Sequence, residues 1–322
     1  IGNTHDNDNN ATLIIQGVAN LFLPLWSTPM ARAHAERAKK HKGVVLGAYT
    51  GRSGTGDRPD PQLIEPMDAL FRYAIQLGMD VDMHIDETND PSTCSLASLC
   101  ESLKKARQNG FQGKVLLGHC CSLSLQSETT QKKLCKQLAT LGAYVVSNPF
   151  TNMSLQDRQG TGPPFGIEIP PYPVARTPQW RGLTLLQELR AAGVTVASAS
   201  DNVRDHWYPY GDYDLLAVWA QTIAMGHLDT APSEGAWADI ITTAAAEAMG
   251  VPLTLNEGEP ADFVIFPSAR RASELFARPQ TDRIVLRRGK PLTTVLLPDF
   301  AEIDDLVKIK TKPVEGKGPI HD

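Results

Sequence analysis

Residues 70–87 read LFRYAIQLGMDVDMHIDE and combine a helical pattern, a glycine and a short strand-like run. The apolar side chains of Leu70, Ala74 and Leu77 recur at helical spacing up to the glycine. A glycine directly after a helix adopts the left-handed backbone conformation that closes the helix C-terminus. The apolar run Met79–Ile85 that follows is typical of a strand. This stretch therefore predicts a helix that returns the chain directly into a strand.

The same order of helix, glycine and strand recurs along the first two thirds of the chain, at Gly110, Gly142 and Gly193. The predicted strands are Leu13–Leu23, Val44–Tyr49, Met79–Ile85, Val115–Gly118, Tyr144–Val146 and Val194–Ala199. Short apolar strands separated by helices indicate a parallel sheet. Six strands fit an open doubly wound sheet as well as part of a (β/α)8 barrel. No Gly-rich nucleotide-binding motif is present.

Composition excludes several classes of protein. The chain has 322 residues, of which 42% are hydrophobic and 21% charged, so it is globular and has room for one barrel-sized domain or two modest ones. A net charge of −5 without a basic run gives no reason to expect nucleic acid as a partner. No apolar stretch approaches the roughly 20 residues of a membrane helix. Five irregularly spaced cysteines favour reduced, buried thiols in a cytoplasmic protein.

The chain changes character near residue 260. The runs Phe263–Phe266, Ile284–Leu286 and Thr293–Leu297 are rich in β-forming residues and are separated by proline and glycine. They predict a small β-domain packed beside the parallel sheet. We therefore expect one domain over residues 1–260, and the small β-domain with a loose tail over residues 261–322.

Ionisable side chains cluster where the predicted strands end. Alternation places Asp82, His84 and Asp86 on one face of their strand, and Glu87 lies just beyond it. A half-exposed strand with a solvated polar face is an equally good interpretation of this cluster alone. In a parallel barrel, however, the C-terminal ends of the strands form the catalytic face.

Two further strands end in the same way, at His119 and at Asp201. Alone, the first fits a structural histidine, and the second fits a helix N-cap. Together with His84 and Glu87 they form a set of imidazoles and carboxylates, which is the ligand set of a hydrolytic Zn²⁺ or Fe²⁺. A bound divalent cation lowers the pKa of water toward 7, and a nearby Glu can relay a proton to a leaving nitrogen.

From about Leu13 to Val307 the chain resembles the cytosine deaminase branch of the amidohydrolase superfamily. The stretches that carry the resemblance are Asp82–Glu87, Gly118–Ser122, Val146–Pro149 with Asn152 and Leu155-Gln156, Arg181-Gly182, and Ser200–Gly211. The resemblance implies a (β/α)8 TIM-type barrel with one divalent metal ion, zinc or iron. It also implies that the C-terminal strands are a remnant of a small β-sandwich domain.

The resemblance assigns roles residue by residue. His84 is similar to a metal ligand, and Asp201 resembles the residue that acts both as metal ligand and as base. Glu87 resembles the general acid/base that handles the exocyclic nitrogen. His119 is similar to the histidine that hydrogen-bonds the water on the metal. Trp207, Asn148 and Asn202 resemble residues that contact the substrate.

The sequence departs from the family pattern at two points. The family's first strand carries His-x-His, and no two histidines here have that spacing. Because His5 resembles the end of the family's second strand, we expect an incomplete barrel that lacks its first two strands, either through truncation or in an evolved pseudoenzyme. The second departure is Leu23-Pro-Leu-Trp26, which has no amide where the bacterial cytosine enzymes carry a glutamine. This places cytosine itself in doubt.

These features predict a metal-dependent hydrolase that cleaves a C–N bond of a small cyclic amine or amide. The favoured reaction is deamination of cytosine or a related pyrimidine-like ring. Two alternatives stay open: a non-catalytic pseudoenzyme or fragment without the His-x-His ligands, and an amidohydrolase acting on another cyclic amide or a triazine-like ring. The expected partner is a small heterocyclic substrate, with neither nucleic acid nor membrane, and a homo-oligomer is compatible with the sequence.

Overall fold

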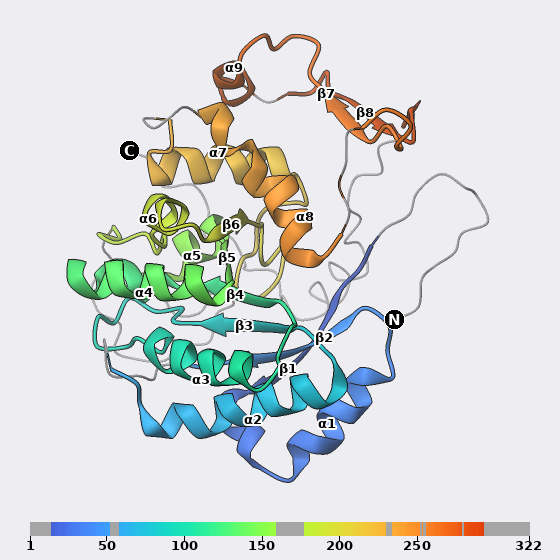
Figure 1. Ribbon diagram of the computed structural model, residues 1–322. Helices are drawn as coiled ribbons and strands as arrows, with labels where there is room; N and C mark the ends of the chain where they lie inside the picture. The colour runs from blue at the N-terminus through green and yellow to red at the C-terminus, as the bar shows by residue number, and fades with distance from the viewer. Residues whose placement is uncertain are drawn as a thin grey trace, which may run out of the picture.

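The computed structural model describes residues 14–51, 58–158, 177–229, 234–251, 253, 256–278 and 280–292 (Figure 1). Its centre is a parallel sheet of six strands in the order β1-β2-β3-β4-β5-β6. The strands are β1 (Gly17–Phe22), β2 (Val44–Tyr49), β3 (Val81–Ile85), β4 (Val115–His119), β5 (Tyr144–Ser147) and β6 (Thr195–Ser198). Within the described residues β1 and β6 do not pair with each other, so the barrel-type sheet is open.

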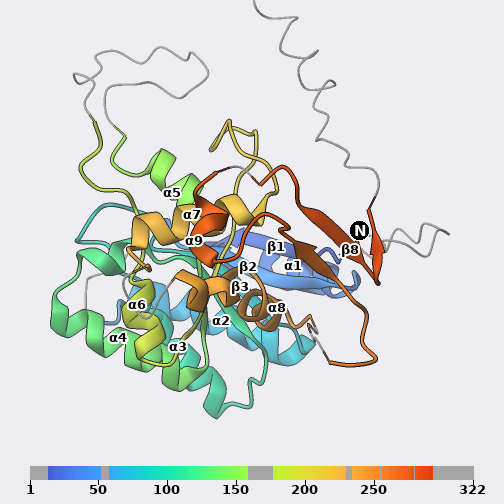
Figure 2. The same cartoon turned by 90° about the horizontal axis from the view of Figure 1, so that it is seen from above.

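Helices follow the strands along the chain, and α1–α4 lie together against the sheet (Figures 1 and 2). The α-helices are α1 (Met30–Lys39), α2 (Pro61–Leu77), α3 (Leu96–Gln108), α4 (Glu128–Leu141), α5 (Pro149–Leu155), α6 (Leu186–Ala191), α7 (Leu215–Gly226), α8 (Thr243–Met249) and α9 (Ala272–Phe276). Three 3-10 segments, η1 (Leu23–Ser27), η2 (Cys121–Leu125) and η3 (Glu234–Ile241), complete the connections. None of the described helices is long and apolar enough to cross a membrane.

Local signals in the sequence determine where the main helices begin and end. Helix α2 starts at the N-cap Asp60, whose side chain accepts a hydrogen bond from Gln62 N, and it ends at Gly78 in the left-handed conformation. Ser127 caps α4 in the same way, and Gly142 closes it. Gly110 also has a positive φ, of 90°. The predicted helix–glycine–strand repeat is therefore confirmed.

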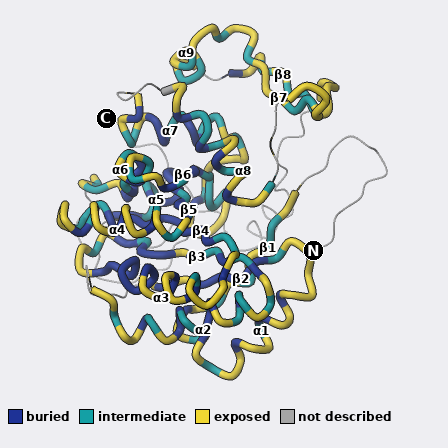
Figure 3. The backbone as a smooth tube through the Cα atoms, viewed as in Figure 1, coloured by how far each residue is buried: buried dark blue, intermediate teal, exposed yellow. Residues whose placement is uncertain are grey.

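The hydrophobic core lies between the sheet and its helices (Figure 3). In β3, Val81, Met83 and Ile85 are fully buried, and they contribute to one cluster with Leu99 and Leu103 of α3. Asp82 and His84 alternate with them and lie on the other face. The five cysteines are buried and free, as the sequence predicts.

Strand boundaries differ from the sequence prediction by a few residues. The first strand begins at Gly17 instead of Leu13, and it ends at Phe22 because the 3-10 segment η1, with Pro24 in its first turn, begins at Leu23. The third begins at Val81, since the chain closes α2 through a hydrogen bond from Met79 N to Ala74 O. These shifts do not alter which side chains stand at the strand ends.

A separate antiparallel sheet follows the parallel one, formed by β7 (Phe263–Ile265), β8 (Ile284–Arg287) and β9 (Lys290–Pro291) in that order. It corresponds to the predicted small β-domain, although the run Thr293–Leu297 lies outside the described residues. The Arg283 guanidinium makes two hydrogen bonds to the Asp214 carboxylate, of 2.7 and 2.8 Å. Because Asp214 is the N-cap of α7, this pair ties the small sheet to the main one.

Candidate active site at the carboxyl ends of the strands

Three strands end in residues with left-handed backbone conformations. Asp86 follows β3 with φ 56°, His119 ends β4 with φ 73° and Cys120 follows with φ 49°, and Asp201 lies beyond β6 with φ 63°. Such conformations are unfavourable for side chains other than glycine, and they concentrate at functional sites. At His119 and Asp201 the turns bring the side chains to the mouth of the sheet.

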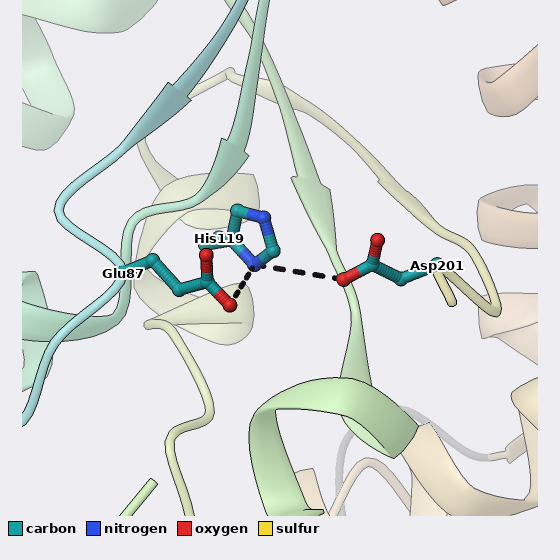
Figure 4. A group of neighbouring side chains, drawn as sticks. All are labelled: Glu87, His119 and Asp201. Atoms are coloured by element: carbon teal, nitrogen blue, oxygen red, sulfur yellow. Dashed lines mark ion pairs between the residues drawn. The ribbon is translucent and has the colours of Figure 1, made fainter. Parts of the chain in front are cut away.

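Glu87, His119 and Asp201 meet at this mouth (Figure 4). His119 Nδ1 lies 3.4 Å from Glu87 Oε1 and 4.0 Å from Asp201 Oδ2. One candidate ligand atom from each residue lies within 4.8 Å of the others. His119 is 2% exposed, whereas the Glu87 side chain retains 30% of its surface. We call these three residues the trio.

Two asparagines of the β5–α5 segment complete the surroundings of His119. Asn152 Nδ2 lies 2.9 Å from His119 Nδ1 and 3.3 Å from Glu87 Oε1. Asn148, the N-cap residue of α5, places its Nδ2 3.5 Å from the same ring nitrogen. Both asparagines are buried, so these contacts are shielded from bulk water.

Burial dominates the electrostatics of the trio. Burial and, secondarily, the Asp201 carboxylate raise the pKa of Glu87 to about 7. Burial also raises the pKa of Asp201, against the lowering effects of His84 and the Thr151 hydroxyl. For His119, burial and the charge of His84 lower the pKa to about 3, so the imidazole is neutral near pH 7. A carboxyl group that titrates near neutrality is suited to take up and release a proton.

His84 lies beside the trio without being one of its three converging residues. Its ring packs edge-on against His119, with the ring centroids 5.1 Å apart. This approach depends on Gly118, which pairs with His84 in the sheet and whose added Cβ would lie 3.3 Å from His84 Cδ2. The glycine of the Gly-His-Cys motif therefore makes room for the His84 ring.

The trio opens into a cleft of about 610 Å³. His84, Glu87, His119 and Asp201 line it together with Asn20, Tyr49, Thr50, Gly51, Thr88, Asn89, Leu155, Gln156, Asn202 and Trp207. A larger groove, of about 760 Å³, lies between α2 and α3 and contains none of the trio. The smaller cleft is the candidate substrate site because the acid–base groups face it.

Residues 24–293 match the model of the amidohydrolase family. The chain belongs to the amidohydrolase family. It is 41% identical over 297 residues to a pterin deaminase of Rhizobium rhizogenes, an alignment covering 92% of this chain and 62% of that protein. The structure is similar to 5-methylcytosine deaminase from Klebsiella pneumoniae bound to 5-fluorocytosine, with a TM-score of 0.65 and 25% identity over 88% of this chain and 64% of that one.

An N-isopropylammelide isopropylaminohydrolase from Burkholderia multivorans is also similar, with a TM-score of 0.63 and 25% identity over 86% of this chain and 62% of that one. This amidohydrolase chain thus spans somewhat under two thirds of the length of these relatives. The family and the TIM-barrel-type fold expected from the sequence are therefore confirmed.

The structure brings most of the predicted site residues of this amidohydrolase together. His84, Glu87, His119, Asp201, Asn202 and Trp207 all line the same cleft. Asn148 instead contacts the His119 ring from behind the cleft lining. Trp207 stands 60% exposed at the rim, where a flat ring could stack on it. Their assigned roles stay predictions.

One expectation about the β3 cluster is wrong. Alternation placed Asp86 on the same face as His84, but its positive φ turns the carboxylate inward, where it is fully buried. There it accepts hydrogen bonds from Ser95 N, at 2.7 and 2.9 Å, and from Leu96 N, at 3.3 Å. Asp86 therefore satisfies the N-terminus of α3, and Glu87 alone supplies the β3 carboxylate of the trio.

Sequence reasoning missed two amides that the fold places at the site. Asn20 of β1 lines the cleft, whereas Leu23 and Trp26, from the stretch that lacks the family's glutamine, are buried in the core. Trp26 there donates its indole N–H to Gly47 O at 3.1 Å. Asn152 was noted only as part of a motif. For Asn20 a signal was available in the sequence, because the alternation of β1 exposes Val18, Asn20 and Phe22 on one face.

The residues present fit a divalent cation. Asp201 Oδ2 is buried and has no hydrogen-bond partner among the described residues, and it faces the His119 ring. An unpaired buried carboxylate oxygen is costly unless a cation or a proton satisfies it. Carboxylate and imidazole donors together suit zinc or another first-row divalent metal.

Proposed function

We propose that this chain carries the acid–base machinery of a hydrolytic deaminase that acts on an amino-substituted nitrogen heterocycle. The observation that supports it most is the convergence of Glu87, His119 and Asp201 at the mouth of a parallel sheet. A proton-transfer carboxyl with a pKa of about 7, a neutral imidazole and an unpaired carboxylate oxygen are the groups such a hydrolysis requires.

In this proposal His84 and Asp201 would hold one divalent ion, zinc or iron. When bound, such an ion supplies a water molecule with a pKa near neutrality. Glu87 takes a proton as the water oxygen adds to the ring carbon that bears the amino group. It delivers a proton to the departing nitrogen, the C–N bond breaks, and ammonia and a ring carbonyl result. The Asp201 carboxylate orients the reacting oxygen, and the neutral His119 ring lies beside both carboxylates.

We favour a pterin-type bicyclic amine as the substrate class. Its support is the 41% identity to a pterin deaminase, against 25% to the structurally similar 5-methylcytosine deaminase. A cleft of about 610 Å³ is within the usual size range of small-molecule sites, so a bicyclic ring fits it. A pyrimidine such as cytosine is the second candidate, because the fold is similar to that of the Klebsiella enzyme and the strand-end motifs resemble the cytosine deaminase branch.

The test is ammonia release by the full-length protein, loaded with zinc or with iron, on a pterin, on cytosine and on an amino-substituted triazine. We expect kcat/KM to be highest with the pterin. Preference for cytosine would overturn the substrate class while leaving the deaminase proposal intact. If protein with a full complement of metal releases no ammonia from any of these rings, the pseudoenzyme alternative is favoured.

A further inference from the structure

Asn152 contacts two members of the trio at once. Its Nδ2 lies 2.9 Å from His119 Nδ1 and 3.3 Å from Glu87 Oε1, so the two amide hydrogens can serve the imidazole and the carboxylate together. Asn152 is 2% exposed, so water does not compete for these bonds. A single amide therefore links the proposed proton-transfer carboxyl to the imidazole beside it.

The contact determines where His119 carries its proton. The Asn152 amide N–H groups only donate, so the Nδ1 nitrogen must accept, and the proton of a neutral ring then resides on Nε2. Asn148 presents a second, longer donor to the same nitrogen, at 3.5 Å. The carboxylates of Glu87 and Asp201 also face Nδ1, at 3.4 and 4.0 Å, and they would favour the opposite tautomer in which Nδ1 donates. The asparagines decide the balance between these two states.

Asn152 is itself held firmly. Its backbone N–H donates to Asn148 O at 3.0 Å, and its carbonyl accepts from Gln156 N at 2.9 Å within the α5 turn. Gly182, with φ 78°, packs against this turn: an added Cβ would lie 3.2 Å from Asn152 Cβ and 2.4 Å from Gln156 Cγ. The Arg181-Gly182 motif of the sequence therefore provides the space in which the α5 side chains sit.

We propose that Asn152 is a positioning residue that holds neutral His119 as its Nε2–H tautomer and holds the Glu87 carboxylate in reach of the reacting atoms. The effect of Asn152 on catalysis rests on the deaminase function proposed above. The assignment of the His119 tautomer does not depend on that function. Groups that orient catalytic residues in this way are typically worth about 10–100-fold in activity.

The first experiment measures the tautomer directly. In the 322-residue chain with ¹⁵N-labelled histidine, two-dimensional NMR near neutral pH reports which ring nitrogen bears hydrogen, and His119→Gln identifies the His119 signals. We expect Nε2–H in the wild-type chain. Asn152→Asp replaces the donor by an acceptor of the same shape, so we expect it to convert His119 to a form with hydrogen on Nδ1. Asn152→Ala should leave a mixture, and Ser154→Ala on the same helix should leave the spectrum unchanged.

The second experiment measures kinetics in the active full-length protein. We expect Asn152→Ala to lower kcat about 10–100-fold while KM changes little, because the affected groups act on the reacting atoms. Circular dichroism and melting temperature establish whether each variant folds. If one of the two Asn152 variants does not fold, the other one tests the proposal.

The outcomes separate the two proposals. Hydrogen on Nδ1 of His119 in the wild-type chain overturns the positioning role whatever the activity, and so does an unchanged tautomer in both Asn152 variants. A tautomer that switches in Asn152→Asp supports the role, even if no heterocycle is deaminated and the proposed function fails. A KM that rises with kcat unchanged would instead make Asn152 a substrate contact.

Discussion

Adjacent carboxylates at the end of β3 have opposite environments. Asp86 is fully buried and accepts hydrogen bonds from the backbone that begins α3, whereas the Glu87 side chain stays 30% exposed and faces the cleft. The left-handed backbone at Asp86 separates the two side chains. One residue therefore stabilises a helix N-terminus while the next faces the cleft, as the proposed proton-transfer role requires.

Replacing the Glu87 carboxyl by an amide tests its role. Glu87→Gln keeps the shape of the side chain but cannot cycle a proton, so we expect kcat of the full-length enzyme to fall about 10²–10⁴-fold. Metal content and melting temperature should stay close to those of the wild type. Steady-state ammonia release, metal analysis and calorimetry measure the three quantities. A variant that retains more than about a tenth of wild-type kcat contradicts the proton-transfer role, and one that loses its metal makes Glu87 a ligand.

At the scale of elements, close backbone approach joins β1, β2 and β3. A Cβ added to Gly47 of β2 would lie 2.3 Å from Val18 Cγ1 of β1 and 3.0 Å from Asp82 O of β3. The Gly47 carbonyl also accepts the indole N–H of Trp26. This glycine therefore leaves room for the Val18 side chain and the Asp82 carbonyl on the strands that neighbour β2.

Gly47→Ala should destabilise the protein by about 1–3 kcal/mol, because the backbone of β3 cannot move aside without disturbing the sheet. Denaturant unfolding followed by circular dichroism measures the loss. In the double variant Gly47→Ala with Val18→Ala, the new methyl group at residue 47 meets a smaller side chain at residue 18. Part of the lost stability should therefore be recovered. If Gly47→Ala is as stable as the wild type, the close approach seen here is relaxed in solution.

At the scale of the whole molecule, Arg283 connects the small sheet to the parallel one. Its two hydrogen bonds to Asp214 are partly shielded, since each side chain keeps under a third of its surface exposed. The exposed apolar residues Phe263, Val264 and Ile265 of β7 show that the small sheet has little core of its own in the described residues. Its position therefore depends on this pair together with α9, whose Phe276 ring packs on Trp219 with centroids 4.7 Å apart.

Arg283→Met keeps the aliphatic stem and removes both hydrogen bonds to Asp214 together with the one from Nε to Gln280 O, so we expect a loss of about 1–2 kcal/mol. The small sheet should be cleaved faster in limited proteolysis, while the parallel sheet stays resistant. Arg287→Met is the matched control, because the ion pair of Arg287 with Asp262 lies within the small sheet's own segment. Equal cleavage rates for both variants would show that the Arg283–Asp214 pair does not hold the two sheets together.

Metal binding is the second property of the whole molecule. Catalytic zinc sites usually have three protein ligands, and the 322-residue sequence has no His-x-His pair to add to His84 and Asp201. We therefore expect the chain alone to hold less than one zinc per molecule after dialysis against a chelator, and to turn over little. Metal analysis by mass spectrometry measures this, with Asp201→Ala as the control. Stoichiometric, chelator-resistant zinc in the chain alone would show that the trio is a complete site.

Much of the architecture was decided by short-range rules that the sequence displays openly. Caps such as Asp60 begin the helices and glycines such as Gly78 end them through contacts with residues a few positions away, so the repeat could be predicted without the fold. Ionisable residues at strand ends were likewise visible as a pattern. The convergence of strand ends at one edge of a parallel sheet then placed His84, His119 and Asp201 near one another.

Only the tertiary structure decided the remaining features, because they depend on contacts between residues far apart in the chain. Glu87, His119 and Asn152 interact across three segments, and their hydrogen-bond partners and pKa values follow from burial that no local pattern encodes. Asn20 reaches the cleft because β1 pairs with β2, while Asp86 leaves it because one backbone dihedral is left-handed. Local sequence patterns predict which groups stand at the strand ends, whereas packing between distant segments selects which of these groups face one another.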